Sequence, residues 1–148
     1  MSLRIQKGVT LIELLVVIGI IGILSLISIP MLRTYGPKLD LSGSAQELVS
    51  DLRYIQQMAV TEQKEYSIKF FPTDKKYQIL QYGTAVILKE RVLPGNIQSL
   101  TASGFTGDEV VYNSYGAVRE EGNVALENSG GQVKNISIKP SGFVEVLN

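Results

Sequence analysis

The pattern of apolar and polar positions divides the chain into three parts. Residues 9–32 are almost continuously apolar, and Glu13 is the only ionisable side chain among these 24 residues. Between residues 40 and 65, apolar positions recur at alternating intervals of four and three, at Leu41, Ala45, Leu48, Leu52, Ile55 and Ala59. This spacing predicts an amphipathic helix with one buried stripe. After Tyr66 the period falls to two, which predicts strands.

The last part, residues 66–148, predicts short strands separated by turns. The predicted strands are 66–70, 77–82, 85–93, 97–101, 109–112, 116–119, 123–128, 132–139 and 143–147. Turn sequences such as Pro94-Gly95 and Pro140-Ser141-Gly142 lie between them. Because the connections are short, we expect mainly antiparallel pairing. The chain therefore predicts an α+β fold, with a long N-terminal helix packed on one or two antiparallel sheets.

The apolar segment 9–32 has the length of a membrane-spanning helix. At about 1.5 Å per residue it is roughly 36 Å long, which is enough to cross the hydrocarbon core of a bilayer. Arg4 and Lys7 precede it and predict a cytoplasmic N-terminus. A secretion signal has a shorter apolar region and a small-residue cleavage site, whereas the first alanine here is Ala45. We expect the helix to remain in the mature protein.

Proline positions divide the helical region into 9–32 and 33–65. Pro30 lacks a backbone donor and predicts a bend. Gly36-Pro37 predicts either a break or a second bend, and with a bend residues 10–65 would form one long helix. Ser44 and Glu47 have the spacing of a capping box at a new helix start.

Glu13 is the informative residue of the apolar segment. An ionised carboxylate at a bilayer centre costs about 2.5–3.5 kcal/mol, so such groups are usually paired. A cut between Gly8 and Val9 would create an ammonium group about 6 Å from Glu13 along the helix axis. Pairing between that ammonium and the Glu13 of a neighbouring subunit would set their axial register. The alternative is a glutamate that reaches the membrane edge or pairs with its own amine.

The residues around Glu13 narrow these alternatives. The N-terminus has a short basic leader that ends at Gly8, followed by Val-Thr-Leu-Ile-Glu and an apolar run. This pattern closely resembles the leader of type IV pilins and type II secretion pseudopilins. The resemblance covers residues 4–30. It implies that a prepilin peptidase removes residues 1–8, cutting after Gly8 and methylating Val9, where phenylalanine is usual. It also implies that Glu13 directs filament assembly and that Pro30 bends the helix.

The same resemblance implies the partners and the location. The partners are other pilins or pseudopilins and an inner-membrane assembly platform. The protein would be a single-pass protein of the cytoplasmic membrane, with its β domain (66–148) outside the cytoplasm.

A subgroup resemblance concerns the rest of the chain. Residues 51–61 and 131–147 are similar to the GspH/FimT group of minor pseudopilins, whose members lie at or near the filament tip. Major pilins often carry a C-terminal disulfide, and this chain has no cysteine. Together these features favour a minor pseudopilin or minor pilin, of a type II secretion pseudopilus or a type IV pilus.

Catalytic chemistry has little support in the sequence. Without histidine or cysteine the chain lacks histidine bases, thiol nucleophiles and the usual zinc ligand sets. The Ser-x-Lys sequences at Ser67 and Ser137 are explained by strand alternation. Neither acidic pair, Asp108-Glu109 or Glu120-Glu121, has the oxygen spacing of a calcium loop. We therefore expect no enzyme, no cofactor and no metal site; a membrane-anchored enzyme is the least favoured hypothesis.

Nucleic acid is a possible but disfavoured partner. Loss of Arg4 and Lys7 from 14 basic side chains leaves 12 against 14 acidic ones, a net charge of −2. A DNA-uptake pilin is the alternative function, with Arg119, Lys134 and Lys139 as its candidate DNA contacts. The acidic residues Glu120, Glu121 and Glu127 dilute this basic set.

Overall fold

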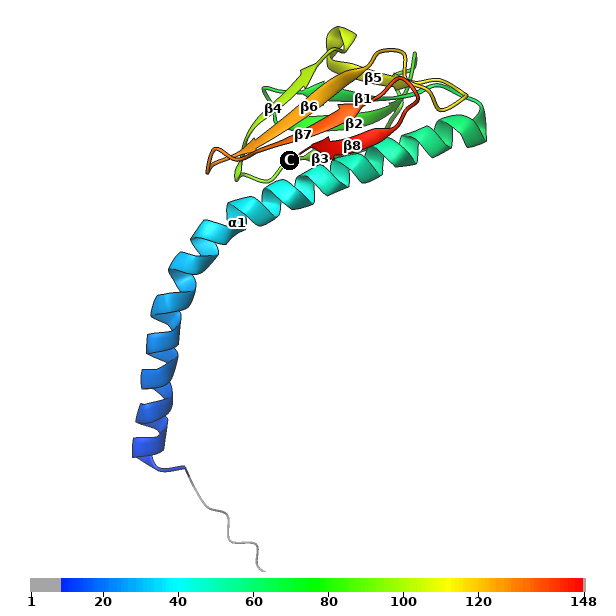
Figure 1. The fold of residues 1–148 in the computed structure, drawn as a ribbon. Helices are drawn as coiled ribbons and strands as arrows, with labels where there is room; N and C mark the ends of the chain where they lie inside the picture. The colour runs from blue at the N-terminus through cyan, green and yellow to red at the C-terminus, as the bar shows by residue number, and fades with distance from the viewer. Residues whose placement is uncertain (1–8, 148) are drawn as a thin grey trace, which may run out of the picture. The chain divides into compact units, whose positions relative to one another are not determined.

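The computed structural model describes residues 9–147, without the side chains of Ile27 and of residues 30–34. The chain divides into two compact units, Met1–Tyr35 and Gly36–Asn148. One helix, α1 (Leu11–Glu62), supplies the described part of the first unit apart from Val9 and Thr10, and it continues into the second (Figure 1). Its bounds include Gly36-Pro37, so of the two alternatives for this dipeptide the break is wrong.

The second unit contains eight described strands in two sheets (Figure 1). The first sheet has the order β3-β2-β1-β5, with β1 (Tyr66–Phe71), β2 (Lys76–Gln81), β3 (Ile87–Val92) and β5 (Glu109–Tyr112). The second has the order β4-β6-β7-β8, with β4 (Ile97–Ser103), β6 (Gly122–Asn128), β7 (Val133–Ile138) and β8 (Val144–Leu147). A short 3-10 helix, η1 (Thr106–Asp108), precedes β5. All the pairings are antiparallel, as the short connections predict.

The core of the second unit forms between the apolar stripe of α1 and the inner faces of the strands. The six predicted stripe residues, from Leu41 to Ala59, are all buried, with at most 2 % of each exposed. They belong to one hydrophobic cluster with strand residues such as Ile68, Ile79, Val124 and Ile136. Removal of this apolar surface from water is the main force that holds the helix on the sheets. The predicted α+β fold is confirmed.

The end of α1 differs slightly from the prediction. The helix ends at Glu62 rather than near residue 65, because Gln63 adopts a positive φ of 54°. The N–H of Lys64 donates to the carbonyl oxygen of Ala59 (3.3 Å), as in a Schellman motif.

Two other predictions are wrong. Residues 116–119 do not form a strand: Val118 makes a single bridge to Tyr112, and Gly116 ends a turn with a φ of +80°. Ser44 is not a helix cap, because it lies inside α1 and is buried there.

Candidate functional site

The first turn of α1 holds Glu13 in a capping box with Thr10. The backbone N–H and the hydroxyl of Thr10 both donate to Glu13 Oε2, at 3.1 and 3.0 Å. In return the N–H of Glu13 donates to Thr10 Oγ1 at 3.3 Å. The Thr-x-x-Glu spacing of this box is visible in the sequence, but sequence reasoning placed a cap at Ser44 and missed it.

The other residues predicted at the N-terminus are only partly described. Gly8 lies outside the described residues. Val9 precedes the helix and is largely exposed. The backbone of Pro30 belongs to α1, but its side chain lies outside the described part, so the bend at this position stays a prediction.

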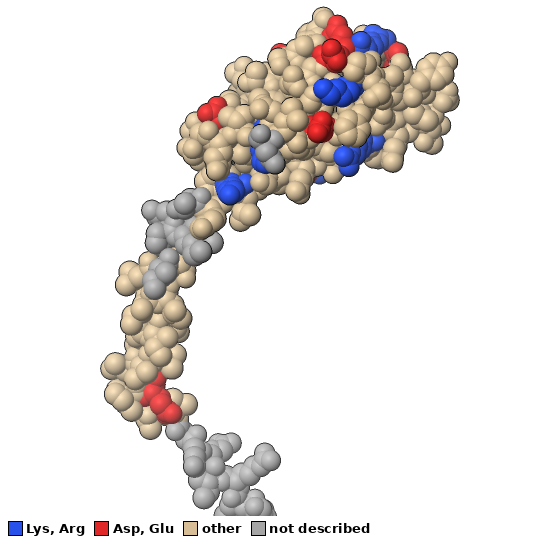
Figure 2. All heavy atoms as spheres, in the orientation of Figure 1, with Lys and Arg blue, Asp and Glu red and all other residues tan. Residues whose placement is uncertain are grey.

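The first half of α1 presents apolar side chains to the surroundings. Every described large apolar side chain from Leu11 to Ile29 is exposed, with exposed fractions between 51 % and 81 %. The hydroxyls of Ser25 and Ser28 donate to the helix's own carbonyl oxygens, at 2.7 and 2.9 Å, so these polar groups need no outside partner. In Figure 2 most of the visible charged side chains lie on the second unit. The described helical segment of the first unit shows acidic atoms only near its first turn. An exposed apolar surface of this extent marks a surface for lipid or protein contact.

Among the residues whose positions are described, no helix is both long and apolar enough to cross a membrane.

Arg119, the first candidate DNA contact, is engaged within the chain. Its guanidinium donates to Glu65 Oε2 at 2.7 Å and to the hydroxyl of Tyr82 at 2.9 Å. It also lies over the Tyr82 ring, 4.3 Å from the centroid. The hydrogen bond to Glu65 raises the pKa of Arg119 above its ordinary value. The residue therefore links the loop before β6 to two segments that flank the first sheet, the connection before β1 and the turn after β2. A DNA phosphate would have to compete with a carboxylate for it.

Lys134 and Lys139 lie at different places along the second sheet. Lys134 is in β7 opposite Leu126 of β6, whereas Lys139 follows the end of β7. Lys139 and Arg119 line two different pockets, and each pocket also contains a glutamate. The structure thus does not gather the three basic side chains into one positive surface.

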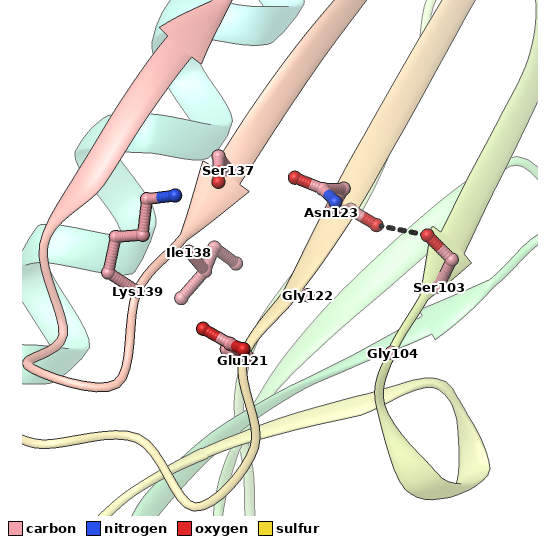
Figure 3. Close-up of a pocket in the computed structure, with 8 residues that line it drawn as sticks. All are labelled: Ser103, Gly104, Glu121, Gly122, Asn123, Ser137, Ile138 and Lys139. Atoms are coloured by element: carbon pink, nitrogen blue, oxygen red, sulfur yellow. Dashed lines mark hydrogen bonds between the residues drawn. The ribbon is translucent and has the colours of Figure 1, made fainter.

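The Lys139 pocket lies across one end of the second sheet (Figure 3). Its volume is about 360 Å³, and its lining includes Ser103, Glu121, Asn123, Ser137 and Lys139. The hydroxyl of Ser103 donates to the Asn123 carbonyl oxygen at 3.2 Å. Ser67, in the first Ser-x-Lys sequence, is fully buried. Ser137 lines the pocket, but among the described residues no hydrogen bond joins its hydroxyl to Lys139, as a nucleophile and its base would require. The pocket therefore gives no support to serine chemistry.

The acidic pairs do not build a metal site in the described part of the chain. Within residues 9–147, no three His, Cys, Asp or Glu side chains come together in the way that metal binding requires. Glu120 instead accepts hydrogen bonds from the N–H and hydroxyl of Thr106, at 2.5 and 2.8 Å. These bonds lower the pKa of Glu120 below its usual value.

Comparison with known protein families decides the family of this chain. The family described as "Prokaryotic N-terminal methylation motif" matches residues 3–29. The family described as "Type II transport protein GspH" matches residues 44–142, which are 99 of the 148 residues. The chain belongs to the GspH family. The two matches fall on the leader with its apolar helix and on the second unit, as the sequence resemblances predict.

A curated relative is similar to about half of this chain. A fimbrial protein of Pseudomonas aeruginosa is 39 % identical over 77 residues, which are 52 % of this GspH-family chain and 49 % of the fimbrial protein. The chain thus spans about half the length of the curated relatives it matches.

Two solved structures share the fold. The type IV minor pilin FimU of Pseudomonas aeruginosa superimposes with a TM-score of 0.61 at 18 % identity, over 75 % of this chain and 90 % of FimU. The minor pseudopilin EpsH of the Vibrio cholerae type 2 secretion system gives a TM-score of 0.62 at 15 % identity, over 73 % of this chain and 96 % of EpsH. At these identities the likeness establishes the pilin-like fold.

Family membership sets the general function. By its family description the chain is a type II transport protein, and its N-terminus carries the prokaryotic methylation motif. Its methylation motif implies processing by a prepilin peptidase and anchoring in the inner membrane, and its family implies filament partners.

Proposed function

We propose that this GspH-family chain is a minor subunit of a type II secretion pseudopilus or type IV pilus, cut after Gly8 and methylated at Val9. Residues 9–32 would anchor it as a single-pass helix, with the second unit outside the cytoplasm. One observation carries the proposal: the first half of α1 exposes its apolar side chains, with Glu13 as its single carboxylate. Such a helix gains free energy when lipid, and later neighbouring helices, cover it.

The capping box suggests how the Glu13 carboxylate is stabilised both in an isolated subunit in the membrane and in the assembled filament. In an isolated subunit the two bonds from Thr10 compensate part of the cost of holding a carboxylate in an apolar environment. A carboxylate has about four acceptor sites, so the cap leaves room for an ammonium donor. A charge-assisted bond from the Val9 ammonium of a neighbouring subunit is stronger than a neutral one. Pairing between subunits would then favour one axial register.

The processing step is tested by the mass of the native protein. From cells with an active prepilin peptidase, we expect a chain that begins at Val9 and carries one methyl group. A chain that still begins at Met1 or Ser2 would refute cleavage, and an unmethylated chain from Val9 would refute the methylation alone.

The role of the Glu13 charge is tested by three matched variants in a deletion strain. Glu13→Gln keeps a capping acceptor but removes the charge, Glu13→Leu removes both, and Thr10→Val removes the hydroxyl bonds while keeping the charge. We expect both Glu13 variants to abolish filament assembly and Thr10→Val to retain it. Assembly by Glu13→Gln at the wild-type level would show that the charge is not needed.

The same strains identify the machine that the subunit serves. Loss of specific exported proteins on deletion, restored by the wild-type gene and not by Glu13→Leu, would assign the chain to a secretion pseudopilus. An unchanged secreted profile with a loss of surface motility would assign it to a pilus.

A DNA-uptake pilus remains the second candidate function. Its candidate contacts are Arg119, Lys134 and Lys139. The engagement of Arg119 with Glu65 does not favour it. A salt-dependent mobility shift with duplex DNA that weakens when the three residues are replaced would support this alternative.

A further inference from the structure

Two turns of the same construction meet at the end of α1 (Figure 1). The first spans residues 113–117, and the second spans residues 139–143. In both, the N–H of the first residue donates to the carbonyl oxygen of the fifth at 2.9 Å. The fourth residue of each is a glycine whose N–H donates to the carbonyl oxygen of the first, at 2.9 and 2.8 Å. These glycines, Gly116 and Gly142, have φ values of +80° and +81°, which other residues rarely adopt.

The two turns pack closely against each other, and both are hydrogen-bonded to α1. A Cβ on Gly142 would lie 2.1 Å from the Gly116 carbonyl oxygen, so only glycine permits this approach. The side-chain amide of Gln56, on α1, donates to the carbonyl oxygens of Gly116 (2.8 Å) and Ser141 (3.5 Å). Within the first turn, Asn113 Oδ1 accepts the N–H groups of the third and fifth residues, at 3.0 and 3.1 Å. The backbone of both turns is therefore fixed.

The locked turns display large side chains to the outside. Tyr115 is 87 % exposed and Phe143 is 59 % exposed, and Val60 of α1, beside Gly116, is 44 % exposed. We call Val60, Tyr115 and Phe143, with the two turns that carry them, the double-turn surface. Exposed aromatic residues on a rigid backbone lose little conformational entropy on binding, which is the property that interface anchors require.

The chemistry of the double-turn surface indicates a protein partner. In the two turns, Asn, Ser, Tyr and Gly predominate, a composition that also suits antibody binding loops. Lys139 is the single residue in these ten positions that is charged at neutral pH. DNA or an anionic membrane would be bound by a cluster of basic residues. Charge is instead depleted here, as it is at the centre of protein interfaces. The complementary partner is an uncharged face of a folded protein with apolar pockets.

The position of the surface suggests which protein this is. In the second unit α1 runs from residue 36, where the anchor-bearing segment joins, to residue 62, roughly 39 Å away at 1.5 Å per residue. The double-turn surface lies at the residue 62 end. The exposed side chains of Val60, Tyr115 and Phe143 leave this end of the unit open to a neighbouring subunit.

We propose that the double-turn surface binds the folded domain of the neighbouring subunit that lies beyond the end of α1 in the filament. The inference rests on the proposed function. Tyr115 and Phe143 are the anchors of the contact, and Gln56 is a positioning residue that holds their turns in place.

A photo-crosslinking amino acid at Tyr115 in the full chain, expressed in its own cells, tests the contact. We expect an adduct whose second component, identified by mass spectrometry, is another pilin-type subunit. The control carries the same amino acid at Val133, which is also exposed but lies at the other end of β7, about 20 Å along the strand from the second turn. No adduct from position 115, an adduct only with an exported protein, lipid or DNA, or an equal adduct from Val133 would overturn the proposal.

A second measurement tests whether the side chains of Tyr115 and Phe143 themselves make the contact. With the crosslinker at Val60, the double variant Tyr115→Ala/Phe143→Ala should lower the adduct yield at least tenfold, whereas Val133→Ala should leave it unchanged. In the same strains, mass spectrometry determines the N-terminal residue of the chain, and filament assembly is compared with and without Glu13→Leu. Correct processing and Glu13-dependent assembly with no loss of adduct would overturn this inference alone. A chain that is neither processed nor dependent on Glu13 would refute the proposed function.

Discussion

Asp51 joins α1 to the first sheet through buried charge, and its replacement by alanine tests how much this junction contributes. Asp51 Oδ2 accepts the hydroxyl of Tyr77 at 2.9 Å, and Oδ1 accepts Lys89 Nζ at 2.6 Å. The Asp51 side chain is 7 % exposed and the Lys89 side chain 35 % exposed. Burial raises the pKa of Tyr77, and the charge of Asp51 adds to this effect. Tyr77 is therefore a neutral donor at every physiological pH.

The expected loss follows from what Asp51→Ala leaves behind. Tyr77, which is almost fully buried, keeps a hydroxyl without an acceptor, and this costs about 1–3 kcal/mol. Breaking a fully buried ion pair costs about 3–5 kcal/mol, but Lys89 can reach water, so loss of its pair costs only about 1 kcal/mol, as for a surface pair. We expect a total loss of about 2–4 kcal/mol. For a unit of this size that is a fall in Tm of roughly 10–25 °C.

The assay is thermal unfolding of the full chain in detergent, followed by the near-ultraviolet circular dichroism of its tyrosines, which reports packing of the second unit. The matched control is Glu47→Ala, because the Glu47–Arg91 pair (2.6 Å) joins the same elements but is about half exposed, and should cost less than about 1 kcal/mol. Tyr77→Phe removes the orphan donor, so the double variant should lose less than the sum of the single losses. Equal losses for Asp51→Ala and Glu47→Ala, or strict additivity with Tyr77→Phe, would refute the reasoning.

Three further predictions concern single positions. Gly142→Ala should destabilise the fold by about 2–4 kcal/mol in thermal unfolding, because the new Cβ would clash with backbone at a φ of +81°. Gly131→Ala, at a φ of +73° but in open space, should destabilise it by only about 1 kcal/mol, and equal losses would refute the packing argument. Tyr112→Phe should leave the free energy of unfolding in urea unchanged or raise it by up to about 2 kcal/mol, because this buried hydroxyl has no hydrogen-bond partner within the described residues; a clear loss would reveal a partner. The hydrogen bond to Glu62 raises the pKa of Tyr66 to about 12 in the folded chain, so its stabilisation should persist up to about pH 10 and disappear between pH 10 and 12. Tyr66→Phe should abolish that part of the pH dependence of Tm, and an unchanged slope would contradict it.

Local patterns were sufficient to predict most of the elements. The stripe from Leu41 to Ala59 is buried as its spacing predicts, and eight of the nine predicted strands exist with similar bounds. The ninth, 116–119, fails because Gly116 adopts a positive φ and the N–H of Val118 donates to Pro140 rather than to a sheet partner. A stretch of only four residues with alternating apolar and polar positions does not show whether it forms a strand or a turn.

Long-range side-chain pairing was not predictable from the sequence. Asp51 contacts Lys89, 38 positions away, and Gln56 contacts Gly116, 60 positions away. Neither pair is signalled by spacing, because strand order decides which residues meet. Thr10 is different: its bond to Glu13 is local, and its Thr-x-x-Glu pattern marks the helix start.

Within the second unit, side-chain hydrogen bonds join α1 to the strands and turns at several points along the helix. Asp40 accepts Asn96 at 2.6 Å, and Gln63 donates to the Ser114 carbonyl oxygen at 3.4 Å. Gln63 follows the last residue of α1. With the bonds of Asp51 and Gln56 between them, polar contacts recur from residue 40 to residue 63 and cover about 33 Å of helix, on both sides of the buried stripe. A force along the helix axis loads these contacts and the stripe in parallel, so no single contact has to carry it. If the subunit is drawn out of a membrane, as proposed, the second unit would be carried along before α1 separates from its sheets.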